Sequence, residues 1–378
     1  MQINTILYWL LILIIYSYIR KNYKNCTKAQ YLYIFITLYL ILFIIIELFQ
    51  QIINVQIWNQ TERTINCYDW FEQYFSKKYD DKFKMTYVES LFDGDYSITI
   101  REATLKYFNY IFDTLGLKPG MKLLDMGCGI GTWMLFCKQR NIDVVGITLS
   151  EEQAKKIREK KLEVIVGNYM TLNKDFVNKF DIVTLIGSTE HNCSTGSMFW
   201  EKSKIDCNKK RVKIFKICNS YLKENGKMCV MTLVFNDKYK FKLTDYPKMY
   251  FMERHYGGRY STFEDYSNSL MNAGFDIYYI KDTTKDFHWS SIADPDHFGA
   301  FKIKWYEDFI NKILYIGKGL IFDPFLLHHW MYYKTDAWMW QFGGYQKTPL
   351  TDKQVESVPC HNKNFFCTKL GQVYVELN

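Results

Sequence analysis

The sequence predicts an α/β fold in which a doubly wound, mostly parallel, Rossmann-like sheet follows two apolar N-terminal helices. Three glycines at alternate positions (Gly127, Gly129 and Gly131) lie between an apolar run and a helix-compatible run. A second apolar run follows at the interval expected for a strand–turn–helix–strand unit. Strand-like and helix-like segments then alternate, which is typical of a doubly wound sheet.

Apolar runs bounded by polar and glycine-rich segments give the expected strands, and amphipathic segments between them give the expected helices. In chain order, the strands are Lys122 to Met126, Val144 to Thr148, Glu163 to Val166, Ile182 to Ile186, Lys227 to Phe235 and Phe275 to Ile280. The helices include Glu151 to Lys160, Lys209 to Lys223 and Thr262 to Asn272. Ligands of such sheets bind at the carboxyl ends of the strands, and the candidate site residues below lie at those ends.

The glycine turn predicts a nucleoside-binding site. Its spacing is G-x-G-x-G, which differs from the G-x-G-x-x-G of dinucleotide-binding folds, and no Lys-Ser/Thr pair follows to hold a triphosphate. The turn therefore suits a nucleoside-bearing ligand without a pyrophosphate, and S-adenosylmethionine (SAM) is the leading candidate. The alternative is a turn in which glycine serves only close packing of the helix on the sheet.

Several segments together resemble the SAM-dependent cyclopropane-fatty-acid and mycolic-acid synthases, with the related fungal sphingolipid methyltransferases. The resemblance runs from about Cys67 to Gln341, and its most specific piece is GITLSEEQ, Gly146 to Gln153. It implies the seven-stranded sheet of class I SAM methyltransferases. The other matching pieces are YDWFEQYF (Tyr68 to Phe75), MTY (Met85 to Tyr87), LKPGMKLLDMGCGIG, FDIVTLIGSTEHN (Phe180 to Asn192), WYEDF (Trp305 to Phe309) and WMWQF (Trp338 to Phe342).

The resemblance implies a set of cofactor contacts. The glycine turn would carry the methionine part and the ribose of SAM, Asp125 would order that turn by accepting backbone N–H bonds, and Gln153 would help to bind the ribose and adenine. Two of these assignments have a simpler alternative, since Gln153 could be a solvated helix residue and Tyr169 a core residue. The complete set is Tyr87, Asp125, Gly127, Cys128, Gly129, Gly131, Thr148, Leu149, Gln153, Asn168, Tyr169, Ile186 and Gly187.

In these relatives a carbon–carbon double bond attacks the SAM methyl group, and a base then removes a proton from the carbocation. The resemblance assigns catalysis to Glu190 and to His191, which follows it. The base of the cyclopropane synthases is a bicarbonate ion, and this chain lacks most of the residues that hold it. Glu89 stands at the family's Cys position and Met231 at its His position. Cyclopropane formation itself is therefore in doubt.

Glu89 suggests a replacement for the bicarbonate. Two carboxylates, Glu89 and Glu190, close together and away from water would raise the pKa of one of them toward that of a useful base. The alternative is that Glu89 points to solvent. We expect carbon methylation of a lipid double bond in an unsaturated acyl chain or sphingoid base. An N-methyltransferase of a lipid head group or small amine, and a non-catalytic SAM-binding membrane protein, remain as alternatives.

Two apolar runs, Ile3 to Ile19 and Tyr31 to Phe49, predict a membrane anchor. A helix of about 20 residues crosses a hydrocarbon core of ~30 Å, and Glu47 is the only charged residue within the runs. The linker between them carries four basic residues, which favours its placement in the cytosol. Two membrane crossings would then leave the catalytic domain on the lumenal side. The supply of SAM and the ten cysteines favour a catalytic domain in the cytosol instead. We expect an integral protein of the endoplasmic reticulum or another internal membrane, and two buried core helices are the alternative.

The expected domains are an anchor (1–52), an N-terminal helical cap (53–118), the SAM-dependent methyltransferase domain (119–346) and a C-terminal extension without assigned role (347–378). The net charge is +8, and Lys202 to Lys216 carries seven Lys or Arg. This run could be a solvated helix face or attract an anionic bilayer. No nucleic-acid module accompanies it, and Cys360, His361 and Cys367 lack a fourth ligand for zinc. The partners expected are a lipid substrate and the bilayer, without nucleic acid or metal. The sequence does not determine an oligomeric state.

Overall fold

The computed structural model describes residues 3–23, 27–53, 61–62, 64–65, 68–69, 72, 90–192, 200–235, 261–283, 285–286, 338–347, 365–368 and 371–376. Its strands are β1 (Lys122–Met126), β2 (Asp143–Thr148), β3 (Glu163–Val166), β4 (Phe180–Ile186), β5 (Leu222–Phe235), β6 (Ser261–Thr262), β7 (Phe275–Asp282), β8 (Trp338–Lys347), β9 (Phe365–Thr368) and β10 (Gly371–Glu376). Its helices are α1 (Ile3–Asn22), α2 (Lys28–Ile53), α4 (Ile100–Leu115), α5 (Thr132–Lys138), α6 (Glu151–Glu159), α7 (Trp200–Tyr221) and α9 (Phe263–Asn272), with 3₁₀ turns η1 (Lys174–Phe176) and η2 (Thr189–Asn192).

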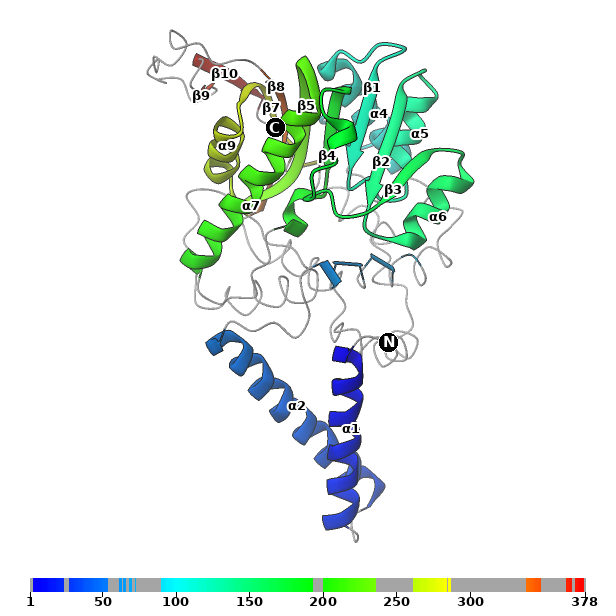
Figure 1. The fold of residues 1–378 in the computed structure, drawn as a ribbon, viewed down its shortest axis with the longest axis vertical. Helices are drawn as coiled ribbons and strands as arrows, with labels where there is room; N and C mark the ends of the chain where they lie inside the picture. Colours follow the sequence, from blue (N-terminus) through cyan, green and yellow to red (C-terminus); the bar gives the residue numbers. More distant parts are fainter. Residues whose placement is uncertain are drawn as a thin grey trace.

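The described strands form one sheet in the order β3-β2-β1-β4-β5-β8-β7-β10-β9, with β6 beside β5 (Figure 1). The strands β3, β2, β1, β4 and β5 pair in parallel, whereas β8 lies antiparallel between β5 and β7. The expected doubly wound sheet is therefore confirmed. The strands β1 to β5 and β7 overlap the six predicted ranges, and β8 adds a seventh strand, the number that the family resemblance implied. The order reverses at β1, between β2 and β4, which is where such sheets bind their ligands.

The extension 347–378, to which the sequence assigned no role, contributes two of these strands. β10 pairs in parallel with β7, and β9 pairs antiparallel with β10. Both lie at the far edge of the sheet from the glycine turn. The extension thus continues the sheet beyond the part that the sequence predicted.

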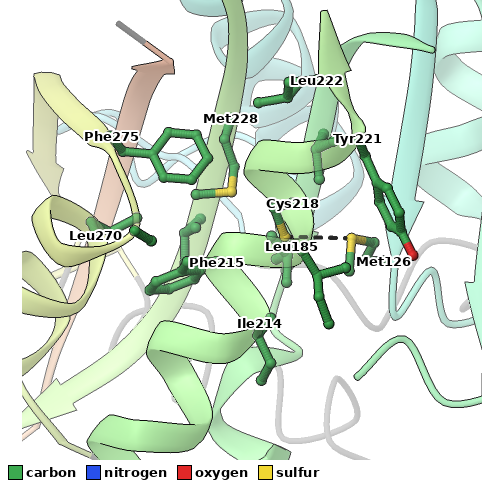
Figure 2. Packing of buried hydrophobic residues seen from close by; sticks show 14 of the residues in the cluster. Met126, Leu185, Ile214, Phe215, Cys218, Tyr221, Leu222, Met228, Leu270 and Phe275 are labelled. Atoms are coloured by element: carbon green, nitrogen blue, oxygen red, sulfur yellow. Dashed lines mark hydrogen bonds between the residues drawn. The ribbon is translucent and has the colours of Figure 1, made fainter. Parts of the chain in front are cut away.

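Helices cover both faces of the sheet. Successive residues of β1 point to opposite faces, so Leu123 packs among α4 and α5 while Leu124 packs among α7 and α9. Figure 2 shows the second of these cores, where Phe215 and Cys218 of α7 lie beside Met228 of β5. The central strands β1 and β4 are buried on both sides, as is usual for parallel sheets.

Local sequence signals set the ends of the helices. Thr99 and Glu102 form a capping box at the start of α4, and Gly116, with φ of 66°, ends that helix in the left-handed conformation. Thr262 and Asp265 form the same box at the start of α9. Each cap satisfies backbone N–H groups that the first helical turn leaves without partners.

The two expected N-terminal helices are present as α1 and α2, and Figure 1 shows them extending away from the sheet. A membrane crossing needs a continuous apolar stretch of about 20 residues. Within the described part of the chain, no helix meets the length and apolarity that a crossing needs. Both helices are present, but the prediction that they form a membrane-spanning hairpin is not supported.

Candidate active site

A cavity lies at the carboxyl ends of β1, β2 and β4, at the point where the strand order reverses. Eleven of the thirteen predicted cofactor residues line it: Asp125, Gly127, Cys128, Gly129, Thr148, Leu149, Gln153, Asn168, Tyr169, Ile186 and Gly187. Gly131 begins α5 behind the wall, and Tyr87 lies outside the described residues. The sheet therefore brings together residues from four separate segments of the sequence.

The glycine turn leaves β1 with its N–H groups directed at the neighbouring strand. The backbone N–H groups of Gly127 and Cys128 donate to the Ile147 carbonyl at 2.8 Å and 3.0 Å. Gly127 has φ of 83°, and a Cβ there would lie 2.5 Å from Cβ of Ser188. Only glycine allows β1 and β4 to approach so closely in this conformation.

Asp125 does not order the turn in the predicted way. Its carboxylate accepts a hydrogen bond from the Thr184 hydroxyl at 2.8 Å, and the N–H groups of the turn use the Ile147 carbonyl instead. Burial raises the pKa of Asp125 to about 7, and the bond from Thr184 only partly offsets this rise. The prediction failed because the backbone of β2 lies close enough to satisfy the turn.

Thr148 and Gln153 form one polar unit at the end of β2. The Thr148 hydroxyl donates to Oε1 of Gln153 at 2.7 Å, and the Ser150 hydroxyl caps α6 by accepting from the Gln153 N–H at 3.1 Å. Gln153 is buried, so the alternative of a solvated helix residue is wrong. The unit presents neutral oxygen and amide groups to the cavity, where a ribose could bond to them.

Tyr169 belongs both to the core and to the cavity wall, so its two predicted roles do not exclude each other. Its hydroxyl donates to the Ser188 carbonyl at 3.0 Å and accepts from the Asn192 amide. Asn168, the residue before it, accepts a bond from the Met170 N–H at 2.9 Å. Ser188 also bonds the Met126 carbonyl at 2.9 Å, which ties the ends of β4 and β1 together.

A segment far upstream closes one side of the cavity. Thr61, Thr64, Ile65 and Tyr68 line the wall, although the sequence assigned none of them to the cofactor. The Tyr68 hydroxyl lies 2.6 Å from Nε2 of His191, and their rings meet edge to face. The family resemblance includes the segment that begins at Tyr68. The local sequence pattern, however, does not predict that this segment folds back over the sheet.

Two further contacts fix this segment to α6. The Ser150 hydroxyl donates to Asp69 at 2.6 Å, and Lys156 pairs with buried Glu72. Burial raises the pKa of Glu72, and the contacts with Lys156 and Gln153 lower it in opposition. The cavity wall thus depends on polar contacts between residues about 80 positions apart in the chain.

The two predicted catalytic residues of η2 are both buried, but they differ in position. His191 lines the cavity, whereas Glu190 stands beside it and is not part of the described wall. Oε2 of Glu190 accepts a hydrogen bond from the Thr232 hydroxyl at 3.1 Å. Glu89, the third predicted catalytic residue, lies outside the described residues.

Other wall residues went unnoticed in the sequence because they are neighbours of the motif residues, or lie in segments that the motifs do not reach. They are Ile130, Thr132, Trp133, Ser150, Met170, Ser188 and Asn192. Trp133 is the most informative of them. Its indole Nε1 is buried and has no hydrogen-bond partner among the described residues, so it is available to an acceptor on a bound molecule.

The open space at the glycine turn and the polar groups of the cavity suit SAM. A Cβ built on Gly129 meets no atom within 4 Å, so the turn faces open space where a ligand can approach the backbone. Thr148, Gln153 and Asn168 supply neutral polar groups for a nucleoside, and Trp133 supplies a donor. Among the described residues that line the wall there is no lysine, arginine or P-loop to hold a polyphosphate.

Fold and site together define a SAM-dependent methyltransferase. The sequence profile of the mycolic acid cyclopropane synthetase family matches residues 56–314, and the chain belongs to that family. It is 28% identical over 231 residues to cyclopropane mycolic acid synthase 2 of Mycobacterium leprae, covering 56% of this chain and 70% of that protein.

Two further similarities agree with this assignment. The chain is 34% identical over 104 residues to the cyclopropane-fatty-acyl-phospholipid synthase of Escherichia coli, which covers 26% of this chain and 25% of that enzyme. The solved mycolic acid cyclopropane synthase CmaA1, in complex with SAH and CTAB, superposes with a TM-score of 0.56 at 18% identity, covering 69% of this chain and 90% of that one. The likeness to CmaA1 concerns the fold alone.

Proposed function

We propose that this protein transfers the SAM methyl group to a carbon of a double bond in a membrane lipid. The observation that carries the proposal is the pairing of the nucleoside cavity with two buried polar residues of η2, His191 in the wall and Glu190 beside it. The names of two family members support a lipid, since one is a mycolic acid synthase and the other a fatty-acyl-phospholipid synthase.

Under this proposal SAM supplies an electrophilic methyl group. The protein binds and orients the cofactor and the lipid, and it excludes water from them. The glycine turn and the Thr148–Gln153 unit hold the cofactor, and Tyr68 covers it from the N-terminal segment. The carboxylate of Glu190 stabilises positive charge that develops on the lipid chain. His191 is oriented by its contact with the Tyr68 hydroxyl.

We propose a methylated chain without ring closure as the product. Met231 stands where the family has the His that holds the bicarbonate ion, and it is fully buried in β5. A thioether is a poor hydrogen-bond partner for an anion. Glu89, from outside the described residues, would take the proton instead, and Glu89→Gln should then lower turnover while SAM still binds.

We further propose that the protein works on the cytosolic face of an internal membrane and meets lipid through α1 and α2. Large apolar side chains of both helices are exposed, among them Leu13, Ile14, Leu32 and Ile44. Cys128, Cys137, Cys207, Cys218 and Cys229 are free and buried, as expected for a reducing compartment.

The test uses the full-length protein, SAM with a deuterated methyl group and vesicles of dioleoylphosphatidylcholine. Tandem mass spectrometry should find the label on the acyl fragment, and dipalmitoylphosphatidylcholine, which lacks double bonds, should gain none. Vesicles of dioleoylphosphatidylethanolamine, whose head group carries a free amine, are assayed in parallel, and label on that head group would replace this proposal with N-methylation. Binding of SAH without transfer to any lipid would favour a non-catalytic SAM-binding protein.

A further inference from the structure

A buried row of hydroxyl groups leads from α9 to the carboxylate of Glu190. The Thr232 hydroxyl of β5 lies 3.1 Å from Oε2 of Glu190 and 3.0 Å from the hydroxyl of Tyr266. The Tyr266 hydroxyl in turn lies 3.1 Å from that of Thr189 in η2. All four residues are buried, so each of these bonds is made in a medium of low dielectric.

Counting protons gives this row a direction. An ionised carboxylate only accepts hydrogen bonds, so the Thr232 hydroxyl must donate its single proton to the bond with Glu190. Thr232 then accepts from Tyr266, and Tyr266, with one proton of its own, accepts from Thr189. The competing acceptor of Thr232, the Leu233 carbonyl, is farther away at 3.4 Å. With Glu190 ionised, every proton in the row therefore points toward its carboxylate.

Arg211 strengthens the hydrogen bonds of the row through the ring of Tyr266. Its guanidinium carbon lies 4.2 Å from the centre of the Tyr266 ring, and its side chain is buried in α7. Hydrogen bonds to Asn208, Ser261 and Ser269 hold it there. A cation over the face of a phenol draws electron density from the ring, which makes the hydroxyl a better donor.

We propose that Tyr266 and Thr232 are positioning residues that hold Glu190 in one orientation, as an ionised carboxylate, while the methyl group is transferred. The inference rests on the proposed function, in which the Glu190 carboxylate stabilises positive charge on the lipid chain. Neither residue touches the cavity, so both act through Glu190. A purely structural row of hydroxyls would instead affect folding and cofactor binding without a selective effect on turnover.

The first test is kinetic and uses the full-length protein with dioleoylphosphatidylcholine vesicles. Tyr266→Phe and Thr232→Val each remove one hydroxyl with little change of shape, and each should lower kcat about tenfold while KM and SAH affinity stay within about twofold. The double variant should be little worse than Thr232→Val, because both changes break the same row. Thr232→Ser keeps the hydroxyl and should restore turnover.

Tyr221→Phe is the matched control. Tyr221 belongs to the same buried cluster as Tyr266, but its hydroxyl accepts from the Asn173 N–H at 2.7 Å. The kcat of Tyr221→Phe should equal that of the wild type. If Tyr266→Phe and Thr232→Val keep full kcat while Glu190→Gln abolishes turnover, the inference is overturned and the proposed function survives.

The second test needs no turnover. Carbon-13 NMR of labelled glutamate carboxyl groups, with Glu190→Gln to assign the signal, follows protonation of Glu190 directly. Tyr266→Phe should raise the midpoint by about one pH unit, since bonds donated to a carboxylate favour its charged form. His191 beside Glu190, Tyr169, which interacts electrostatically with Glu190, and Arg211 over the ring of residue 266 all remain in this variant. An unchanged midpoint would overturn the inference, whatever the lipid assay shows.

Discussion

The absent side chain of Gly127 determines how closely the ends of β1 and β4 can approach. Its φ of 83° lies in the left-handed region, and the nearest atom to an added Cβ would be Cβ of Ser188 at 2.5 Å. Ser188 cannot move freely, because its hydroxyl donates to the Met126 carbonyl. The cofactor turn and the strand that carries η2 are therefore coupled at one residue.

Gly127→Ala should destabilise the fold by about 2–5 kcal/mol, through backbone strain and overpacking together. It should also abolish SAH binding in calorimetry, because the turn must move. Gly120→Ala is the matched control, since Gly120 has a similar φ of 86° and open space around its Cβ. That variant should lose only about 1–2 kcal/mol and bind SAH normally. Equal losses in the two variants would show that contact with Ser188 is unimportant.

Asp125 gives the stability a dependence on pH. Burial raises the pKa of this carboxyl from 3.8 to about 7, so between these two pH values the folded chain binds a proton that the unfolded chain has lost. Stability must then fall as the pH rises through this window and become level above it. The folded state accepts this cost at the position where the cofactor turn begins.

Asp125→Asn should remove that dependence. In urea denaturation, the free energy of unfolding of the variant should gain on the wild type by about 2–4 kcal/mol between pH 4 and pH 8. Asp143→Asn changes an exposed carboxylate at the start of β2 and serves as the surface control. Parallel curves for wild type and Asp125→Asn would contradict the role of burial.

At the scale of elements, the cavity is completed by the segment around Tyr68 and Glu72. Three polar contacts attach it: Tyr68 to His191, Asp69 to Ser150, and Glu72 to Lys156. Two of them reach Ser150, the N-cap of α6, and Lys156 in the middle of that helix, and the Ser150 hydroxyl also accepts from the Gln153 N–H. Loosening this segment should therefore weaken cofactor binding as well as stability.

Glu72→Gln should destabilise the protein by about 1–3 kcal/mol, because Glu72 is buried and its charge pairs with Lys156. SAH affinity should fall by about threefold to tenfold, which corresponds to at most about 1.4 kcal/mol. Glu151→Gln breaks an exposed pair with Arg158 on the same helix and should cost about 0–0.5 kcal/mol. Thermal unfolding and SAH titration of both variants measure the difference, and equal SAH affinities would argue against a closing role.

At the scale of the whole molecule, the exposed apolar side chains of α1 and α2 contrast with the polar contacts around the cavity. Exposed apolar surface of this extent usually marks an interaction site. Figure 1 places the two helices apart from the sheet, so they can meet a lipid surface without disturbing the cofactor site. This arrangement suits an enzyme whose substrate resides in a bilayer.

Deleting residues 1–53 should abolish co-sedimentation with dioleoylphosphatidylcholine vesicles and leave SAH affinity within about twofold of the full chain, because binding to a bilayer scales with the apolar area buried. Turnover on the same vesicles should fall more than SAH binding does. Full co-sedimentation of the shortened protein would show that another surface, such as the basic face of α7, meets the lipid.

Local sequence determined much of this protein. The ends of β1 and β3 were predicted to the residue, and the glycine turn was placed correctly, because each depends on neighbours within a few positions. The glycine unit and the family resemblance together predicted eleven residues of the cofactor wall. The motifs also predicted the helices α6 and α9 to within about one residue, since their caps are short-range hydrogen bonds.

Tertiary structure decided the rest, because the deciding contacts join residues far apart in the chain. Strand β8 enters between β5 and β7 although more than 50 residues separate it from β7. Tyr68 meets His191 across 123 positions, and the bonds of the glycine turn went to Ile147 instead of Asp125. The hydroxyl row behind Glu190 is equally invisible in the sequence, since it joins η2, β5 and α9 only once the sheet has folded.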